Sequence, residues 1–227
     1  MCGRFALNSP PQRIARQFSL DEVPELLPRY NIAPSQAIPI IRQGGEGRRE
    51  LVMVRWGLIP AWSKEPKSSY STINARAETV ATKPAFRSAF RARRCLVPAD
   101  AYFEWQPRPD SKLKQPFLIS LKDQSLFAFA GLWERWELAD TVIESCTIIV
   151  TDANALTGPI HDRMPVILDP SAYEAWLDRN TTATLLQALL KPYDSDQMRA
   201  YPVSTLVNNP RHDDPQVIEP ASALNTG

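Results

Sequence analysis

The sequence predicts an α+β fold, a single domain whose mostly antiparallel, barrel-like β-sheet is flanked by short helices. Two patterns support this class. Many short strand-like runs follow one another along the chain, and the few helical patterns are short and do not alternate regularly with them. The length of 227 residues suits one sizeable domain. With no internal repeat or linker, we expect one domain over 1–227, with a core from about 2 to 220 and a short C-terminal tail.

Helices are predicted where capping residues precede apolar residues spaced four apart. The first begins at Ser9-Pro10-Pro11 and places Ile14 and Phe18 on one face. We expect this helix to hold the N-terminal strand in place. Further short helices are predicted to begin at Pro84, Ser171 and Thr181.

Strands are predicted where β-branched and aromatic residues form short runs. Residues 37–42 and 51–56 are expected to form a hairpin, whereas 29–34 is expected to be an irregular loop. Residues 95–106 are expected to form one strand interrupted by Pro98. The remaining strands are predicted at 116–121, 126–133, 142–150 and 166–168, with 202–204 and 217–218 closing the sheet.

Composition excludes several function classes. The net charge of +1 provides no global basic field for nucleic acid, so any anion site must be local. No apolar run is long enough to span a bilayer, and no signal-peptide segment is evident, so we expect a cytoplasmic protein. Three cysteines without close spacing argue against a disulfide framework and against a zinc site. Cys95 and Cys146 lie in apolar runs and are expected to be small buried side chains.

Cys2 is the residue with the most distinctive chemistry. The initiator methionine is usually removed before a small residue, which would leave Cys2 with a free α-amine close to its thiol. The α-amine has a pKa of about 8, so a useful fraction is neutral near pH 7, and the thiolate is a strong nucleophile. The amine can condense with an aldehyde to an imine, and the thiol can then close a thiazolidine ring. The alternative is an incidental cysteine in a disordered chain start.

Two other residues have the chemistry of a general acid or base. Glu104 lies between Phe103 and Trp105, and a desolvated carboxylate has a raised pKa. An outward glutamate on an amphipathic strand fits the same spacing equally well. His161 lies on a loop just before an apolar strand and is flanked by an acid and an arginine. This position favours a catalytic imidazole. A structural role is its alternative, and His212, in a polar turn, is assigned no role.

Several polar and aromatic residues are candidates for ligand contact. Asn74 and Arg76 lie two residues apart and would face the same way on an extended segment. The loop 56–62 either plugs the core or offers a flat ring to a ligand; core packing is favoured more for Trp56 than for Trp62. The densest positive stretch is expected to be a solvated face, with phosphate contact as the minor alternative; it comprises Arg87, Arg91, Arg93 and Arg94.

Six motifs recur in a fixed order from Cys2 to about Glu219. They are Cys2-Gly3-Arg4-Phe5, Tyr30–Pro34, Trp56–Trp62, Asn74–Thr79, Phe103–Trp105 and His161–Pro165. Each is weak alone, but together they resemble the SOS response-associated peptidase (SRAP) family. The resemblance implies self-processing or aminopeptidase removal of Met1, and covalent capture of abasic sites in single-stranded DNA as a thiazolidine. It further implies a DNA-damage role, a lyase-like activity and, in some members, reversal of the crosslink.

The resemblance also implies roles at the matching positions. Cys2 resembles the nucleophile, and Asn74 resembles the asparagine that positions the N-terminal amine or the sugar. Glu104 resembles the acid or base of imine formation, and His161 the histidine that assists ring opening and crosslink chemistry. The implied DNA-binding positions are Arg4, Trp62, Arg76 and Arg163.

Two other function classes stay open at this point. Glutamine amidotransferases with an N-terminal nucleophile also begin Met-Cys-Gly and would use Cys2 to attack a glutamine amide. The Arg4-Phe5 pair and the motifs around Glu104 and His161 count against them. A non-catalytic single-strand binder would use the arginines and tryptophans alone. We expect a monomer, nucleoid-associated when bound to DNA, with no cofactor, metal or membrane contact; the sequence does not identify its protein partners.

Overall fold

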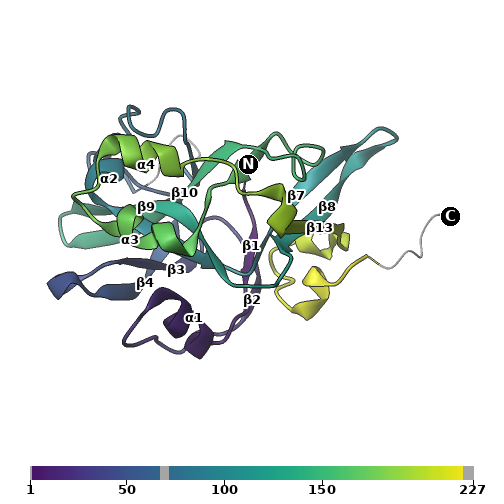
Figure 1. The fold of residues 1–227 in the computed structure, drawn as a ribbon, viewed down its shortest axis with the longest axis horizontal. Coiled ribbons are helices and arrows are strands. Elements are labelled where there is room, and N and C mark those ends of the chain that lie inside the picture. The colour runs from purple at the N-terminus through teal and green to yellow at the C-terminus, as the bar shows by residue number, and fades with distance from the viewer. Residues whose placement is uncertain (1, 67–71, 222–227) are drawn as a thin grey trace.

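Two β-sheets packed on one main core build the fold in the computed structural model of the protein (Figure 1). The structure describes residues 2–66 and 72–221; the predicted removal of Met1 and most of the predicted C-terminal tail therefore lie outside it. The first sheet has the strand order β13-β8-β7-β1-β2, and the second has the order β11-β10-β4-β3-β6-β9-β12, with β5 paired to β10. Most pairs are antiparallel, but β10 runs parallel to β4 and β5. The α+β class is thus confirmed.

The elements have the following bounds. In the first sheet they are β1 Phe5–Leu7, β2 Arg29–Ile32, β7 Ala101–Arg108, β8 Ser111–Leu121 and β13 Met198–Pro202. In the second they are β3 Ala37–Gln43, β4 Arg49–Trp56, β5 Asn74–Arg76, β6 Arg94–Ala99, β9 Phe127–Leu138, β10 Thr141–Asp152, β11 Arg163–Pro165 and β12 Ile167–Leu168. The α-helices are α1 Pro11–Phe18, α2 Arg87–Ala92, α3 Tyr173–Leu177 and α4 Ala183–Leu189. The 3₁₀ helices are Gly45–Gly47, Pro170–Ala172, Ser195–Gln197, Thr205–Asn208 and Pro215–Ile218.

Helix α1 forms where it was predicted. Proline in its first turn fixes φ for the helix, and Ile14 and Phe18 are fully buried. Ser19 ends it in the left-handed conformation, with φ 53°. The ring of Phe18 stacks on Tyr173 of α3 at a centroid distance of 5.4 Å. The helix is therefore attached to the core through Ile14 and Phe18.

The segment 95–106 was predicted as one strand interrupted by Pro98, and this is wrong. Pro98 lies inside β6, opposite Ala128 of β9, and the strand pairs with β3 only at Leu96. A proline is tolerated there because its missing N–H faces a region with few other strand partners. The break between β6 and β7 lies at Asp100, whose carboxylate accepts hydrogen bonds from the backbone N–H groups of Asn8 and Ser9.

Two other predictions fail, the first because distant residues supply the partners and the second because the local sequence favours a turn. Residues 29–34 were expected to be irregular, yet β2 pairs with β1, and Asp213 accepts hydrogen bonds from the backbone N–H groups of Tyr30 and Asn31. Residues 217–218 were expected in the sheet, but they lie in the 3₁₀ helix Pro215–Ile218. Asp214 caps this helix and Pro215 opens it, so the local sequence favours a turn over a strand.

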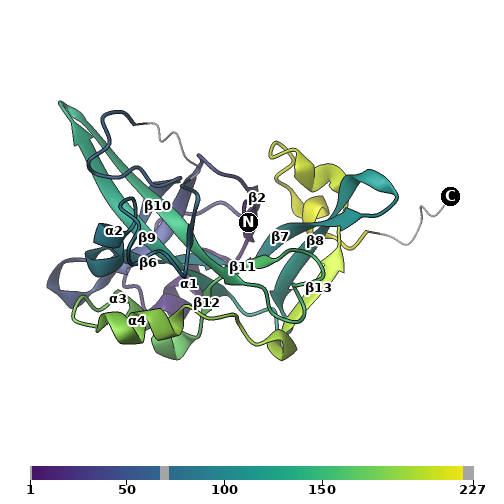
Figure 2. The same cartoon turned by 90° about the horizontal axis from the view of Figure 1, so that it is seen from above.

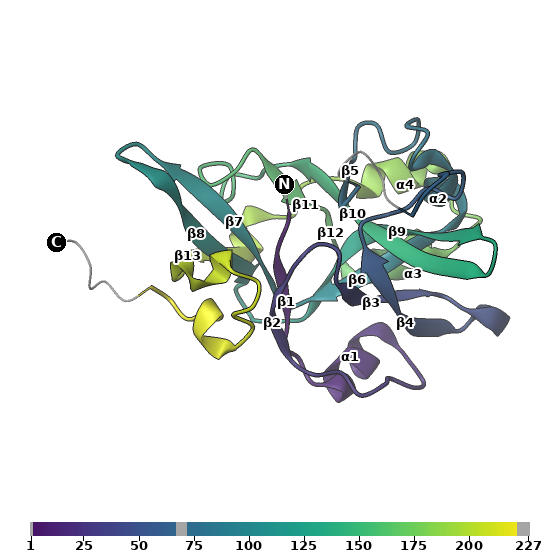
Figure 3. The same cartoon turned by 180° about the vertical axis from the view of Figure 1, so that it is seen from behind.

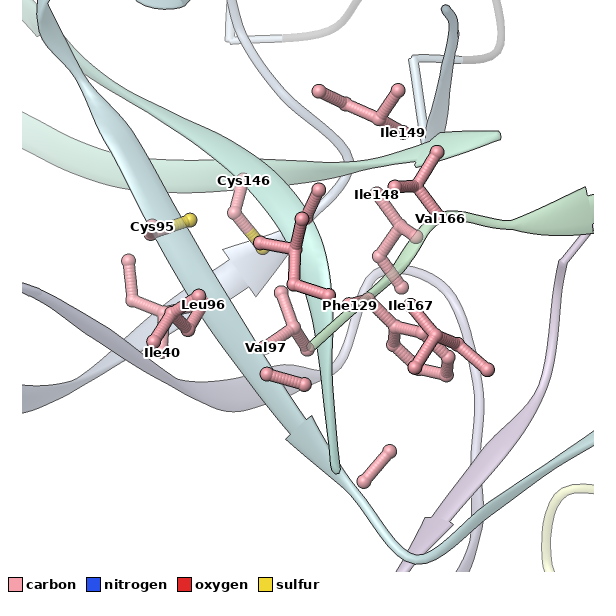
Figure 4. Packing of buried hydrophobic residues seen from close by; sticks show 14 of the residues in the cluster. Ile40, Cys95, Leu96, Val97, Phe129, Cys146, Ile148, Ile149, Val166 and Ile167 are labelled. Carbon is pink, nitrogen blue, oxygen red and sulfur yellow. The ribbon is translucent and has the colours of Figure 1, made fainter. Parts of the chain in front are cut away.

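The core confirms the prediction for Cys95 and Cys146, which are both fully buried (Figure 4). They pack among aliphatic side chains of β6, β9 and β10. Between them Gly131 leaves no room for a side chain, because a Cβ there would lie 2.9 Å from the Cys95 sulfur. No helix within residues 2–66 and 72–221 has the length and apolarity to cross a membrane.

Candidate active site

Strand pairing carries Cys2 into the interior of the molecule. Phe5 of β1 pairs with Tyr102 of β7, and the Phe103 N–H donates to the Arg4 carbonyl at 3.0 Å. Because the strands are antiparallel, the residues before Phe5 run alongside those that follow Tyr102. The start of β1 consequently lies near the centre of the molecule, close to β7 and β11 (Figures 2 and 3). Cys2 is fully buried there, so it does not belong to a disordered chain start.

The Cys2 thiol is protonated in this environment. Burial raises its pKa well above the ordinary range for cysteine, and the charge of Glu104 raises it further. The same interaction indicates that Glu104 and Cys2 lie within electrostatic reach of each other. The thiol therefore needs a nearby positive charge or a hydrogen-bond donor before it can react as a thiolate.

Glu104 lies on β7 opposite Phe117 and is 3% exposed, so the outward orientation that its spacing allowed is wrong. Burial raises the pKa of its carboxyl to about 7, and the charge of Asp162 adds to this shift. A group with such a pKa is divided between its acid and base forms near neutral pH. This is the property that proton transfer in both directions requires.

His161 lies on the loop between β10 and β11, where its backbone N–H donates to the Thr157 carbonyl at 2.9 Å. Its Nδ1 accepts the Arg163 N–H at 3.0 Å and lies 2.9 Å from a carboxylate oxygen of Asp162. Burial lowers the pKa of the ring and outweighs the opposite effect of Asp162, so the imidazole is neutral at pH 7.

The loop of His161 faces the strand of Glu104. The Gln106 side-chain amide on β7 donates to the Pro159 carbonyl at 2.9 Å, which ties the loop to that strand. Asp162 acts on the pKa of Glu104 from the same loop. The structure thus brings Cys2, Glu104 and the loop of His161 to one region.

Asn74 joins the second sheet through β10. It pairs with Ile148, and its side-chain amide donates to the Ile148 carbonyl at 3.4 Å. The side chain is 9% exposed, and its Oδ1 has no hydrogen-bond partner within the described part of the chain. Buried acceptors are normally satisfied, so this oxygen is a candidate acceptor for a ligand or for an amine.

The four predicted DNA-binding residues fall into two groups. Arg76 and Trp62 are exposed, and Trp62 retains 68% of its accessible surface. Arg163 instead forms ion pairs with Glu78 and Asp152. The fourth residue, Arg4, is part-buried within a hydrogen-bond network.

Arg4 fastens the N-terminal strand to the C-terminal segment. Its Nη1 donates to the Asn31 side chain at 2.8 Å and to the Val207 carbonyl at 2.6 Å. Its guanidinium also lies 5.9 Å from the centroid of the Trp105 ring. Sequence reasoning missed this network, because Asn31 and Val207 are separated by 176 residues.

The positive stretch before β6 is only partly a solvated face. Arg87 and Arg91 are exposed, but Arg93 forms an ion pair with Glu134 at 2.7 Å. Arg94 is 3% exposed, and its guanidinium donates to four backbone carbonyls near the ends of α2 and α3. Arg94 therefore closes two helix ends, and the prediction of solvent exposure is wrong for it.

Tyr102 was also missed. It is fully buried, and its hydroxyl has no hydrogen-bond partner among residues 2–66 and 72–221. The alternation of side chains along a strand could have identified it, because Tyr102 lies two residues before Glu104 and faces the same side.

Comparison with known proteins identifies the family of this chain. The family model described as "SOS response associated peptidase (SRAP)" matches residues 1–210. The chain belongs to this family. The resemblance inferred from the six motifs is thereby confirmed.

Members of the SRAP family with curated names are similar to this chain over most of its length. Abasic site processing protein YoqW of Bacillus subtilis (strain 168) is 49% identical over 224 residues, covering 96% of this chain and 99% of its own. Abasic site processing protein HMCES of Xenopus tropicalis is 34% identical over 220 residues, covering 83% of this chain and 65% of its own. A crystal structure from Bacteroides thetaiotaomicron has a TM-score of 0.87 and 30% identity, covering 97% of this chain and 100% of its own.

Proposed function

We propose that this SRAP protein processes abasic sites in single-stranded DNA by covalent capture on Cys2, after removal of Met1. The observation that carries the proposal is the buried Cys2 thiol within electrostatic reach of Glu104, whose pKa is raised to about 7. The names of YoqW and HMCES, both abasic site processing proteins, support this substrate class.

The first step is imine formation. The Cys2 amine attacks the aldehyde of the opened deoxyribose, and the resulting carbinolamine loses water. Glu104 accepts a proton from the attacking amine and donates one to the departing hydroxyl, which its pKa near neutrality permits. The unpartnered Oδ1 of Asn74 accepts an N–H of the amine or a sugar hydroxyl. The neutral His161 assists opening of the sugar ring.

The second step is ring closure. A protonated imine next to the thiol lowers the pKa of that thiol, because a nearby positive charge favours the thiolate. The sulfur therefore becomes nucleophilic only after the imine has formed. This order of events suits a buried cysteine, since burial protects the thiol from other electrophiles until the substrate is attached.

DNA contact is assigned mainly to the exposed residues Arg76 and Trp62. A phosphate bound by Arg76 gives salt-dependent affinity. An aromatic ring adds about 1–3 kcal/mol per stacked base without sequence preference. Arg163 would have to exchange its contacts with Glu78 and Asp152 for a phosphate. Arg4 acts through its network with Asn31.

The remaining features of the proposal follow the family resemblance. They are a SOS-type DNA-damage role, self-processing or aminopeptidase removal of Met1, lyase-like chemistry and crosslink reversal. We further propose that the protein is a cytoplasmic monomer without cofactor or metal. The single-domain organisation over 1–227 is part of the same proposal.

The test uses protein whose loss of Met1 has been verified by mass measurement. It is incubated with a single-stranded oligonucleotide that carries one abasic site, and the heat-stable adduct is quantified. We expect an adduct with the wild type and with Cys146→Ala, a second buried cysteine, and none with Cys2→Ala. An undiminished adduct in Cys2→Ala would reject the mechanism. Glutamine hydrolysis without any adduct would favour the amidotransferase alternative.

A further inference from the structure

The face of β7 that carries Glu104 also carries a second polar group with no assigned task. We propose that the hydroxyl of Tyr102 is a further catalytic group, which donates a hydrogen bond to the Cys2 sulfur as the thiazolidine ring closes. This inference rests on the proposed function and adds a residue to its second step.

Packing places Tyr102 in the same buried cluster as Cys2. Side chains two residues apart on a strand share a face, so Tyr102 lies with Glu104. Cys2, Phe5 and Tyr102 belong to one buried cluster. The alternate residues, among them Ala101 and Phe103, belong to a second cluster under the C-terminal segment.

Packing fixes the ring of Tyr102. The side chain is fully buried, and the ring makes an edge contact with Phe129 at a centroid distance of 6.0 Å and an interplanar angle of 77°. Phe129 also contacts Phe5, the strand partner of Tyr102, at 5.9 Å. The hydroxyl is therefore held in the interior and is not exposed to solvent.

The hydroxyl has an unusual hydrogen-bond status for such a position. It is buried without a partner in the described parts of the chain, although buried hydroxyls are normally paired. Burial raises its pKa well above the ordinary range, and the charges of Cys2 and Glu104 add to the shift. The phenol thus keeps its proton throughout the neutral pH range and can only donate or accept as a neutral group.

A neutral thiol is a weak acceptor, so the hydroxyl gains little from pairing with it before reaction. As negative charge develops on sulfur, the same hydroxyl becomes a charge-assisted donor. The interaction is therefore stronger in the transition state than in the ground state, which is the condition for catalysis.

The step balances without an external reagent. The carbon–sulfur bond forms while the π pair of the C=N bond moves to nitrogen. The thiol proton passes to the Glu104 carboxylate, and the ring nitrogen keeps the proton that it carried as the protonated imine. Tyr102 keeps its own proton, and nothing is oxidised or reduced.

The experiment compares Tyr102→Phe with Tyr173→Phe, a matched control. Tyr173 is likewise buried, at 2% exposed, but it stacks on Phe18 of α1. Imine is measured by borohydride trapping and thiazolidine by the heat-stable adduct without borohydride, in single turnovers between pH 6 and 9.

We expect Tyr102→Phe to form the imine at the wild-type rate and to close the ring about ten- to a hundredfold more slowly, the range of one hydrogen bond to a charged group. The pH dependence of the ring-closure rate should also move to higher pH, because the thiolate has lost its hydrogen-bond donor. Tyr173→Phe should match the wild type in both steps.

Normal ring closure in Tyr102→Phe, or an equal slowing of both steps with no pH shift, would overturn the inference. Such a result with a wild-type adduct still present would leave the proposed function standing. Absence of any adduct with the wild type would reject both proposals.

Discussion

The polar groups on the two faces of strands β1 and β7 differ in their hydrogen bonding. On the outer face, the Arg4 Nη1 donates to Asn31 and to the Val207 carbonyl, and only its buried Nε has no partner among the described residues. The Asn31 amide nitrogen in turn lies within hydrogen-bond distance of three C-terminal carbonyls, at 2.7 to 3.2 Å. On the inner face, Tyr102 and, from the second sheet, Asn74 hold buried oxygens with no partner among the described residues.

This difference explains how buried polar groups without hydrogen-bond partners are kept in the interior. Buried unpaired polar groups are costly, and strands that carry them tend to shift until they find partners. The network of the outer face resists such a shift, because Asn31, Asp213 and Arg4 fix β1 and β2 against the C-terminal segment. One face fastens the strand, and the other face keeps its hydrogen-bonding capacity for a reactant.

The largest effect is expected from Asn31→Leu. This change removes the fully buried amide that joins Arg4 to the C-terminal carbonyls. We expect a loss of about 4 kcal/mol in the free energy of unfolding, measured in urea, together with loss of adduct formation. Asn180→Leu, at an exposed asparagine, is the control. A loss below about 0.5 kcal/mol would show that the outer face does not fasten the strand.

Glu104→Gln should change how stability depends on pH. The folded protein holds the Glu104 proton up to a pKa of about 7, above the ordinary value of 4.5, so ionisation opposes folding. Stability of the wild type should therefore fall relative to the variant as pH rises from about 4.5 to 7, by about 3 kcal/mol in total. Denaturation at several pH values measures this difference. Parallel stability curves for the two proteins would contradict a buried, protonated carboxyl.

Arg4→Lys separates fastening from DNA contact. Lysine lacks the planar fork that reaches Asn31 and Val207 together, so we expect about 2 kcal/mol lower stability. The salt dependence of DNA affinity should stay the same. In Arg76→Gln, the exposed arginine, stability should stay the same and the slope of log affinity against log salt should fall by about 1. The reverse pattern would assign Arg4 to the phosphate.

The smallest effect is expected from Trp62→Ala, which alters neither face. Its ring is 68% exposed, so stability should not change. Affinity for single-stranded DNA should weaken by about 1 kcal/mol, the lower end of the range for one stacked base. Leu185→Ala, at another exposed apolar side chain, is the control for the binding measurement. Equal affinity in the two variants would remove Trp62 from the DNA contact.

Local patterns predicted the parts of the fold that depend on neighbouring residues. Proline in the first turn and apolar spacing identified α1, and alternation identified the hairpin of β3 and β4. The break at Asp100 and the strand β2 escaped prediction because their side-chain partners lie far away in the sequence; Asp213 is 182 residues from Asn31.

The candidate site was predictable to a similar degree. Aromatic neighbours made a buried Glu104 one of two equal alternatives, and the structure shows that it is the buried one. Residue type alone did not reveal that Arg4 links the N-terminal strand to the C-terminal segment, since its hydrogen-bond partner Val207 lies 203 residues away. The burial of Arg94 was hidden for the same reason, because half of the carbonyls that it contacts belong to the end of α3.

Asp100 alone separates β6 of the second sheet from β7 of the first. Because side chains alternate along this stretch, the side that each residue of β7 faces depends on the number of residues between β6 and β7. One extra residue at the junction would turn Glu104 and Tyr102 outward and bring Phe103 and Trp105 inward, although the composition would hardly change. The length of this connection is therefore under stricter constraint than the identity of most residues in it, and insertions or deletions should be far more damaging here than replacements.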